Sequence, residues 1–300
     1  MTIYHEGLGP LSPLFNELLD RAAERRAQGS TPRVAFDCDQ TLIEGDIGEA
    51  ALATLALRAE LPTEQSWWAP LESAIGAQAR DELRLQYLEA RDAQRVPPAL
   101  CRALLVAYES LCKRDVRQGY LFAAGLWQGR ALDERTRLAE DLVAKALSAP
   151  LSLCDQTGAI SSRGVRVRPL MRALVKALEA EGVEVWVVSS SERSLVAALA
   201  ARLGLSSSQV LGLDFKLIGG RVTGQPIEPV VIERGKCERF MSVHSEPPIG
   251  MFGDSQYDLP LMELSAWGAL IDHGDEALAA RARALGAHVI PATTLRPNGS

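Results

Sequence analysis

The feature that most constrains the fold is a repeated alternation of short apolar runs with helical patterns. The runs are RVAFD (33–37), VEVWVVS (183–189), PIGMFGD (248–254), GALID (268–272) and AHVI (287–290). Apolar, β-branched runs separated by amphipathic helices are typical of a parallel sheet that is covered on both faces. We therefore predict an α/β fold with a doubly wound parallel sheet, whose active site lies at the carboxyl ends of the strands.

A long helical segment interrupts this alternation after the first run. About 145 residues separate the first two runs, far more than one crossover helix requires, and the pattern from about Asp46 to Ala149 is helical throughout. We predict an all-helical domain at 46–159, inserted into a core domain made of residues 1–45 and 160–300. Two alternating runs within 209–224 flank Gly219-Gly220 and predict a β-hairpin.

Four acids follow two of the apolar runs. Asp37 and Asp39 lie in DCDQT at the end of the first run, and Asp254 and Asp258 lie in GDSQYD at the end of 248–254. The carboxyl ends of parallel strands meet at one edge of a sheet, so we expect these acids to lie together. Oxygen ligands without histidine favour Mg²⁺ as the bound cation.

Groups that suit a phosphate occur at the same edge. Ser189 and Ser190 end the second run just before a helical pattern, where free backbone N–H groups attract anions. Lys236 is one of only five lysines in the chain. A carboxylate beside a metal-bound phosphate can attack phosphorus, which indicates covalent phosphoryl transfer. Taken alone, the serines are equally compatible with a helix N-cap.

In this order, the residues resemble the four motifs of the haloacid dehalogenase superfamily: D-x-D-x-T, a strand-end Ser or Thr, a Lys, and G-D-x-x-x-D. The resemblance covers residues 33–46 and about 165–272. It implies that Asp37 is the nucleophile and a Mg²⁺ ligand, together with Asp254 and the backbone carbonyl of Asp39. It further implies that Asp39 is the general acid and base, and that Asp258 supports Asp254.

The resemblance also implies phosphate ligands and a cap. Ser189, with Ser190 beside it, and Lys236 would bind the phosphate, and the helical insert resembles the C1 cap of the phosphoserine phosphatase-like branch. DCDQTLIEGDIGEA and LFAAGLWQG look more like phosphorylcholine phosphatase-type members. Two positions depart from the family pattern: Gln40 stands where Gly or Asn is common, and Tyr257 where phosphoserine phosphatases usually carry Asn.

The insert offers a hypothesis about the substrate. It holds six of the ten Trp and Tyr residues: Trp67, Trp68, Tyr87, Tyr108, Tyr120 and Trp127. Ring faces attract quaternary ammonium groups, and Asp46 or Glu49 would add a counter-charge, although both acids are equally well explained by the first turn of a helix. These features suit phosphocholine or phosphoethanolamine. Phosphoserine is the alternative, because Arg80, Arg84, Arg91, Arg114 and Arg117 offer partners for its carboxylate.

Composition limits other functions. No apolar stretch approaches the roughly 20 residues of a membrane-spanning helix. The start of the sequence shows no secretory signal pattern and the five cysteines form no C-x-x-C, so we expect a cytoplasmic protein with reduced thiols. The net charge of −6 and the lack of a basic run argue against a nucleic-acid partner. Two other functions are less compatible with the motifs: a dehalogenase would not need Asp39, and a non-catalytic binding module would be expected to have lost a motif residue. The sequence does not indicate the oligomeric state.

Overall fold

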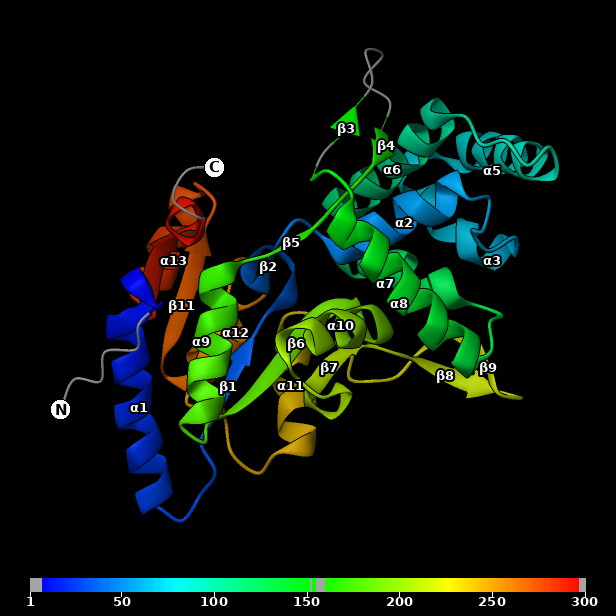
Figure 1. Cartoon of the computed structure of the whole chain (residues 1–300). Helices are drawn as coiled ribbons and strands as arrows, with labels where there is room; N and C mark the ends of the chain where they lie inside the picture. Colours follow the sequence, from blue (N-terminus) through cyan, green and yellow to red (C-terminus); the bar gives the residue numbers. More distant parts are fainter. Residues whose placement is uncertain (1–6, 152, 155–159, 297–300) are drawn as a thin grey trace.

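A computed structural model describes residues 7–151, 153–154 and 160–296, and at its centre is a six-stranded parallel sheet (Figure 1). The strands run in the order β12-β11-β10-β1-β6-β7. Their bounds are β1 (Arg33–Phe36), β6 (Glu184–Glu192), β7 (Val210–Leu213), β10 (Gly250–Gly253), β11 (Gly268–Asp272) and β12 (His288–Pro291). Five of the six correspond to the predicted apolar runs, and the predicted α/β class is confirmed.

The central strand shows why these runs form a sheet. Val34, Ala35 and Phe36 of β1 are all fully buried, because helices cover both faces of the sheet. Val34 pairs with Val185 of β6 on one side and with Gly250 of β10 on the other. This burial requires apolar side chains in succession rather than the alternation seen in strands that are exposed on one face.

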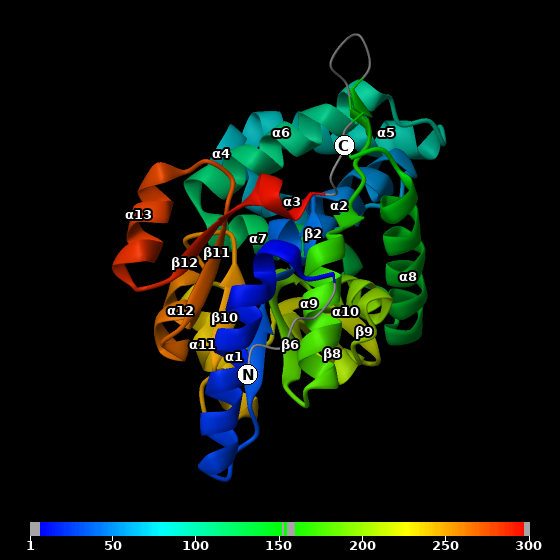
Figure 2. The same cartoon turned by 60° about the vertical axis from the view of Figure 1, so that its left-hand side comes forward.

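Helices between the strands cover the two faces of the sheet (Figures 1 and 2). Right-handed crossovers place α9 and α10 on one face, where α1 also packs, and α11, α12 and α13 on the other. The bounds are α1 (Ser12–Ala27), α9 (Pro169–Ala180), α10 (Arg193–Ala200), α11 (Arg234–Val243), α12 (Leu259–Ser265) and α13 (Glu276–Ala284).

The segment after β1 is helical, as predicted, and lies over the carboxyl end of the sheet (Figures 1 and 2). Its helices are α2 (Ile47–Leu57), α3 (Gln65–Trp68), α4 (Glu72–Ile75), α5 (Ala77–Asp92), α6 (Pro98–Arg114), α7 (Val116–Ala124) and α8 (Leu132–Ser148). We call this segment the helical insert. The proposed domain boundaries remain a prediction, and residue 159 lies outside the described residues.

The insert is joined to the sheet by two short strands that pair with each other. The chain leaves through β2 (Ile43–Glu44) and returns through β5 (Arg166–Val167), and Ile43 is paired with Val167 in an antiparallel arrangement. A further antiparallel pair, β3 (Leu153–Cys154) and β4 (Ile160–Ser162), lies on the return path. Both connections of the insert are therefore close together.

The predicted hairpin exists, but it begins later than the sequence pattern indicated. β8 (Phe215–Ile218) and β9 (Arg221–Pro226) form the hairpin around Gly219 and Gly220, which adopt positive φ angles of 58° and 74°. The preceding run is β7, whose four residues are buried and extend the parallel sheet beside β6. The sequence does not separate the two because only Asp214 lies between them.

Two further findings concern membrane-spanning helices and cysteines among the described residues. Within the described part of the chain, no helix has the length and apolar character needed to cross a membrane. Cys38, Cys101, Cys112 and Cys237 carry free thiols.

Candidate active site

The candidate site lies where β1, β6 and β10 end. Asp37 follows β1, and its backbone amide donates to the carbonyl of Phe252 (2.8 Å). Lys236, near the start of α11, places its Nζ 2.6 Å from Asp37 Oδ1 and 2.5 Å from Asp258 Oδ1. The lysine side chain is only 2% exposed. Burial opposes its charge, yet the carboxylates of Asp258 and Asp37 raise the pKa of Lys236 above its ordinary value.

The Asp258 carboxylate is held by hydrogen bonds within the protein. Its Oδ2 accepts hydrogen bonds from the backbone amides of Asp254 (3.2 Å) and Ser255 (3.0 Å) and from the Ser255 hydroxyl (2.8 Å). A Cβ atom on Gly253 would lie 2.5 Å from the Asp258 side chain, which explains the glycine before Asp254. Among the described residues, none donates a hydrogen bond to the Asp254 carboxylate, so that group is free to bind a ligand.

The donor set fits a hard divalent cation. Carboxylate oxygens of Asp37, Asp254 and Asp258 all lie within 4.8 Å of one another, and oxygen-only ligands suit Mg²⁺. Burial, partly offset by Lys236, raises the pKa of Asp37 to about 7, and burial together with the neighbouring Asp37 raises the pKa of Asp254. A bound cation would compensate for these crowded negative charges.

Asp39 is held by two hydrogen bonds in the tight turn Cys38–Leu42. Its Oδ1 accepts from the backbone amide of Ile47 (2.7 Å), and its Oδ2 accepts from the Ser191 hydroxyl (2.6 Å). Burial, followed by the charges of Asp46 and Asp37, raises the pKa of Asp39 well above its ordinary value. The side chain is thus fixed in place and tends to hold a proton.

The turn also explains an unusual residue. Gln40 has a left-handed backbone with φ of 55°, a conformation that favours glycine or asparagine. Its carbonyl accepts a hydrogen bond from Nη2 of the buried Arg168 (3.2 Å), which helps to hold the turn. Cys38, between the two aspartates, is fully buried, and burial raises the pKa of its thiol, so it is not a reactive thiolate.

The three serines at the end of β6 differ in their contacts. The buried Ser189 accepts the backbone amide of Ser191 (3.1 Å), whereas the Ser190 hydroxyl donates to the Val231 carbonyl (2.8 Å) and is engaged there. The interpretation of the serines as an N-cap is wrong, because Glu192 caps α10. Ser191 was not among the predicted site residues. The available signal was the alternation of side chains along a strand, which places Ser189 and Ser191 on one face.

These side chains surround a cavity of about 180 Å³. It is lined by Asp37, Asp39, Gln40, Asp46, Tyr120, Ser189, Ser190, Ser191, Lys236, Asp254, Ser255 and Tyr257. Tyr120 belongs to α7 of the insert, so the insert and the sheet both contribute walls. A larger surface groove of about 700 Å³ is lined by Arg117 but by none of the predicted catalytic, metal-binding or phosphate-binding residues, so the smaller cavity is the candidate site.

The acids predicted for substrate binding occupy different places. Asp46 lines the cavity and also caps α2, where its Oδ1 accepts the backbone amide of Glu49 (2.8 Å). Glu49 is not among the lining residues, and its carboxylate pairs with Arg163. Burial and the nearby Asp46 raise the pKa of Glu49 to about 7, with Arg163 opposing the shift.

Most of the aromatic residues of the insert pack against one another. Trp67 forms an edge contact with Trp68 (ring centroids 5.0 Å apart), and Trp68 packs near Tyr87 (5.5 Å). Tyr120 and Tyr257 both line the cavity and make an edge-on ring contact, with their centroids 6.2 Å apart. The five arginines considered for a substrate carboxylate are absent from the cavity lining.

Comparison with known proteins identifies the family. The chain belongs to the haloacid dehalogenase-like hydrolases, because the family's sequence profile matches residues 34–263. No curated protein sequence matches at a significant level.

Solved structures show the same fold at low identity. A conserved, functionally unknown protein from Anaerococcus prevotii is similar (TM-score 0.67, 16% identity, 93% of this chain and 91% of that chain). A protein of unknown function from Bordetella pertussis is also similar (TM-score 0.59, 16% identity, 88% and 100%). A phosphoserine phosphohydrolase-like protein from Francisella tularensis is less similar (TM-score 0.44, 14% identity, 83% of this chain and 93% of that chain).

Proposed function

We propose that this hydrolase is a Mg²⁺-dependent phosphatase that cleaves small phosphate monoesters through an aspartyl phosphate. The observation that carries the proposal is the buried Lys236, which contacts Asp37 and Asp258 in a cavity that Asp39 and Ser189 also line. A buried ammonium group with three donors suits a phosphate that sits beside a carboxylate nucleophile. Lys236 and Ser189 would then orient the phosphate for attack.

The proposed reaction uses two aspartates. A carboxylate oxygen of Asp37 forms a bond to phosphorus, and the bond from phosphorus to the ester oxygen breaks. Asp39, whose raised pKa favours the protonated form, donates its proton to the departing oxygen. Water then attacks phosphorus and gives a proton to Asp39, the bond from phosphorus to the Asp37 oxygen breaks, and inorganic phosphate leaves with both aspartates restored. Bound Mg²⁺ would supply positive charge opposite the phosphate, held by Asp37, Asp254 and the backbone carbonyl of Asp39.

The geometry of Asp39 favours this chemistry over the alternatives. A dehalogenase has no use for a second acid at this position, yet Ile47 and Ser191 both hold the Asp39 carboxylate in the cavity wall. A non-catalytic binding module would likewise not require a general acid. Within the family, we place the chain in the C1-capped, phosphoserine phosphatase-like branch as part of the same proposal.

We further propose that the substrate carries a cationic leaving group, as in phosphocholine or phosphoethanolamine. Asp46, Tyr120 and Tyr257 all line the cavity and offer one carboxylate and two rings to an ammonium group. These tyrosines, rather than the packed tryptophans, are therefore the rings that a substrate in the cavity would contact. The volume of about 180 Å³ is below the roughly 300–1,000 Å³ of cavities for drug-sized ligands, which suits a small substrate.

A panel of phosphate monoesters, assayed with the purified protein and Mg²⁺, tests both proposals. Turnover of p-nitrophenyl phosphate is expected. If no ester of the panel is hydrolysed, the phosphatase proposal is refuted. The ratio of kcat/KM for phosphocholine to that for phosphoserine is expected to exceed one. A ratio below one would favour phosphoserine, and negligible turnover of both would remove the cationic substrate while leaving the phosphatase intact.

A matched pair of variants sharpens the test of the substrate. Asp46→Asn keeps the size of the side chain and removes its charge, so kcat/KM for phosphocholine should fall more than that for p-nitrophenyl phosphate. Glu44→Gln, outside the cavity, is the control and should leave the ratio unchanged. Equal effects of Asp46→Asn on both substrates would show that its charge does not recognise the leaving group.

A further inference from the structure

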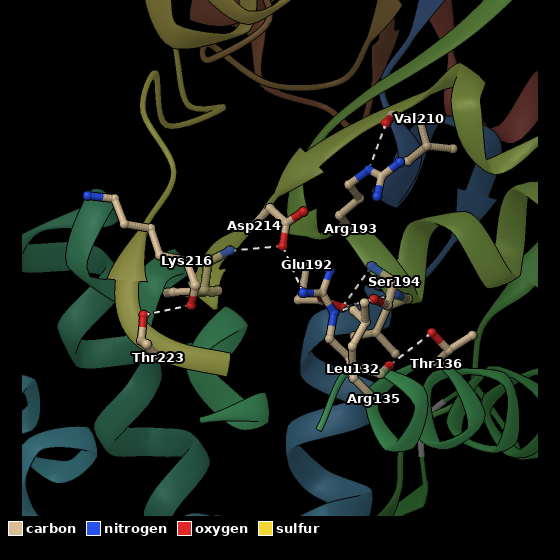
Figure 3. A network of polar contacts seen from close by, with 12 residues as sticks. Leu132, Arg135, Thr136, Glu192, Arg193, Ser194, Val210, Asp214, Lys216 and Thr223 are labelled. Atoms are coloured by element: carbon tan, nitrogen blue, oxygen red, sulfur yellow. Dashed lines mark hydrogen bonds and ion pairs between the residues drawn. The ribbon is translucent and has the colours of Figure 1, made fainter. Parts of the chain in front are cut away.

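A buried arginine joins the helical insert to the sheet (Figure 3). Arg135 lies on α8, and its side chain is only 4% exposed. Its Nη1 is 2.8 Å from Asp214 Oδ1, its Nε is 3.0 Å from Glu192 Oε1, and the same Nε donates to the Ser194 hydroxyl. One guanidinium of the insert therefore contacts the ends of two neighbouring strands, β6 and β7.

The partner carboxylate lies directly after the serines of the candidate site. Glu192 is the last residue of β6 and is nearly fully buried. While Oε1 pairs with Arg135, Oε2 accepts the backbone amides of Ser194 (2.9 Å) and Leu195 (3.1 Å) at the start of α10. Ser191, the residue before Glu192, donates to Asp39. A displacement of Glu192 would thus be transmitted to groups that line the cavity.

A second link lies on the same edge of the insert. The backbone amide of Gly129 donates to the Val222 carbonyl, and the amide of Val222 donates to the Arg130 carbonyl, both at 2.9 Å. These bonds attach the chain just before α8 to strand β9 of the hairpin, which follows Asp214. We call Gly129–Arg135, with Glu192, Asp214 and Val222, the anchored edge.

The edge formed by α7 is held differently. There, Tyr120 makes an edge-on ring contact with Tyr257. Arg117 pairs with Glu228 at 2.9 Å, but their side chains are 51% and 64% exposed. Exposed ion pairs contribute little to stability, whereas an arginine buried between two carboxylates is costly to disrupt. The polar contacts at the two edges therefore differ in strength.

We propose that Arg135 is a positioning residue that fixes the insert to the end of β6, so that the insert opens at the Tyr120–Tyr257 edge. Substrate would reach the cavity between these tyrosines while the anchored edge keeps Ser189, Ser191 and Asp39 in register. The effect on turnover rests on the proposed phosphatase function. The mechanical role of Arg135 does not.

Amide hydrogen exchange tests the mechanical role without turnover. Arg135→Gln should raise exchange at Ser194 and Leu195 and at Gly129 and Val222, but not in strand β1. Arg137→Gln is the matched control, because Arg137 lies on the same helix with a side chain that is 74% exposed. Unchanged exchange in Arg135→Gln, or a uniform rise across the chain as in general destabilisation, would overturn the proposal.

Kinetics test the consequence for the cavity. Arg135→Gln should lower kcat for p-nitrophenyl phosphate by roughly 10- to 100-fold, as expected for misplaced reacting groups, with a smaller change in KM. Arg135→Lys, which keeps the charge, should recover part of the loss. A folded Arg135→Gln variant within threefold of the wild-type kcat would contradict the positioning role. If Arg135→Gln does not fold, Asp214→Asn replaces it, because this variant keeps the pair between Arg135 and Glu192. Asp214→Asn should lower kcat less than Arg135→Gln would. An unchanged kcat in Asp214→Asn would contradict the proposal.

The direction of opening can be measured with Mg²⁺ and orthovanadate, a mimic of the transferred phosphoryl group. Binding to the wild-type protein should reduce exchange in α7 (Val116–Ala124) and leave the anchored edge unchanged. Equal protection of both edges would overturn the proposed direction. If the protein turns over no phosphate ester, the phosphatase proposal is refuted. Amide hydrogen exchange in the Arg135→Gln variant would still decide the mechanical role of Arg135.

Discussion

Glu192 provides a quantitative test of the buried contact between the insert and the sheet. Burial raises its pKa to about 7 from 4.5, although Arg135 and the amides of Ser194 and Leu195 oppose the shift. Between these two pH values, the folded protein holds a proton that the unfolded chain has lost. Glu192 therefore contributes stability that is complete below about pH 4.5 and is lost as the pH rises through about 7.

The size of the effect follows from the two pKa values. Each pKa unit corresponds to about 1.4 kcal/mol, so the contribution of Glu192 changes by at most ~3 kcal/mol over this window. Glu192→Gln resembles the protonated side chain and does not titrate. The wild-type free energy of unfolding, relative to that of the variant, should thus fall by up to ~3 kcal/mol as the pH rises from 4.5 to above 7.

Urea unfolding at pH 5, 6, 7 and 8, at constant ionic strength and with EDTA, measures this difference. Glu134→Gln is the control, because Glu134 also lies on α8 but its side chain is 45% exposed, and its curve should run parallel to that of the wild type. Parallel curves for wild type and Glu192→Gln, or a relative gain of wild-type stability with rising pH, would refute the reasoning.

Three further predictions concern the reaction. Asp37→Asn is nearly isosteric and should keep the fold while lowering turnover by several powers of ten. A variant that retains more than about a tenth of the wild-type rate, a loss of less than roughly 1.4 kcal/mol in the barrier, would exclude Asp37 as nucleophile. Asp39→Asn should slow alkyl phosphates more than p-nitrophenyl phosphate, whose leaving group needs no proton, and equal losses would limit Asp39 to shaping the turn. EDTA should abolish turnover, with Mg²⁺ restoring it and Ca²⁺ doing so poorly, and full activity in EDTA would contradict the metal site.

The sheet was predictable because its strands are buried on both faces. Burial of Val34, Ala35 and Phe36 leaves a continuous apolar run in the sequence, and the polar residues that follow such runs meet at one edge. The sequence pattern did not separate β7 from the hairpin, because both contain apolar residues and only Asp214 lies between β7 and β8. The helical character of the insert was likewise visible in its periodicity.

The contacts across the cavity could not be predicted from the sequence. Ser191 and Asp39 are 152 positions apart, and their hydrogen bond depends on how the end of β6 meets the turn after β1. Arg135 lies within an amphipathic helix where an arginine ordinarily indicates an exposed face, but the docking of α8 buries it. For the same reason, nothing in the sequence distinguished Tyr120, which lines the cavity, from Trp68, which packs inside the insert.

The pairing of β2 with β5 has a consequence for how such a chain can change over evolutionary time. Because Ile43 lies opposite Val167, the polypeptide returns to the sheet almost where it left it. The length and shape of the intervening helices can therefore vary without altering the distance that the linkers must span. Replacement of the whole segment would exchange one end of the cavity, with Tyr120, while the strands that carry Asp37, Ser189 and Asp254 keep their register. A new substrate could thus be acquired without rebuilding the reactive groups.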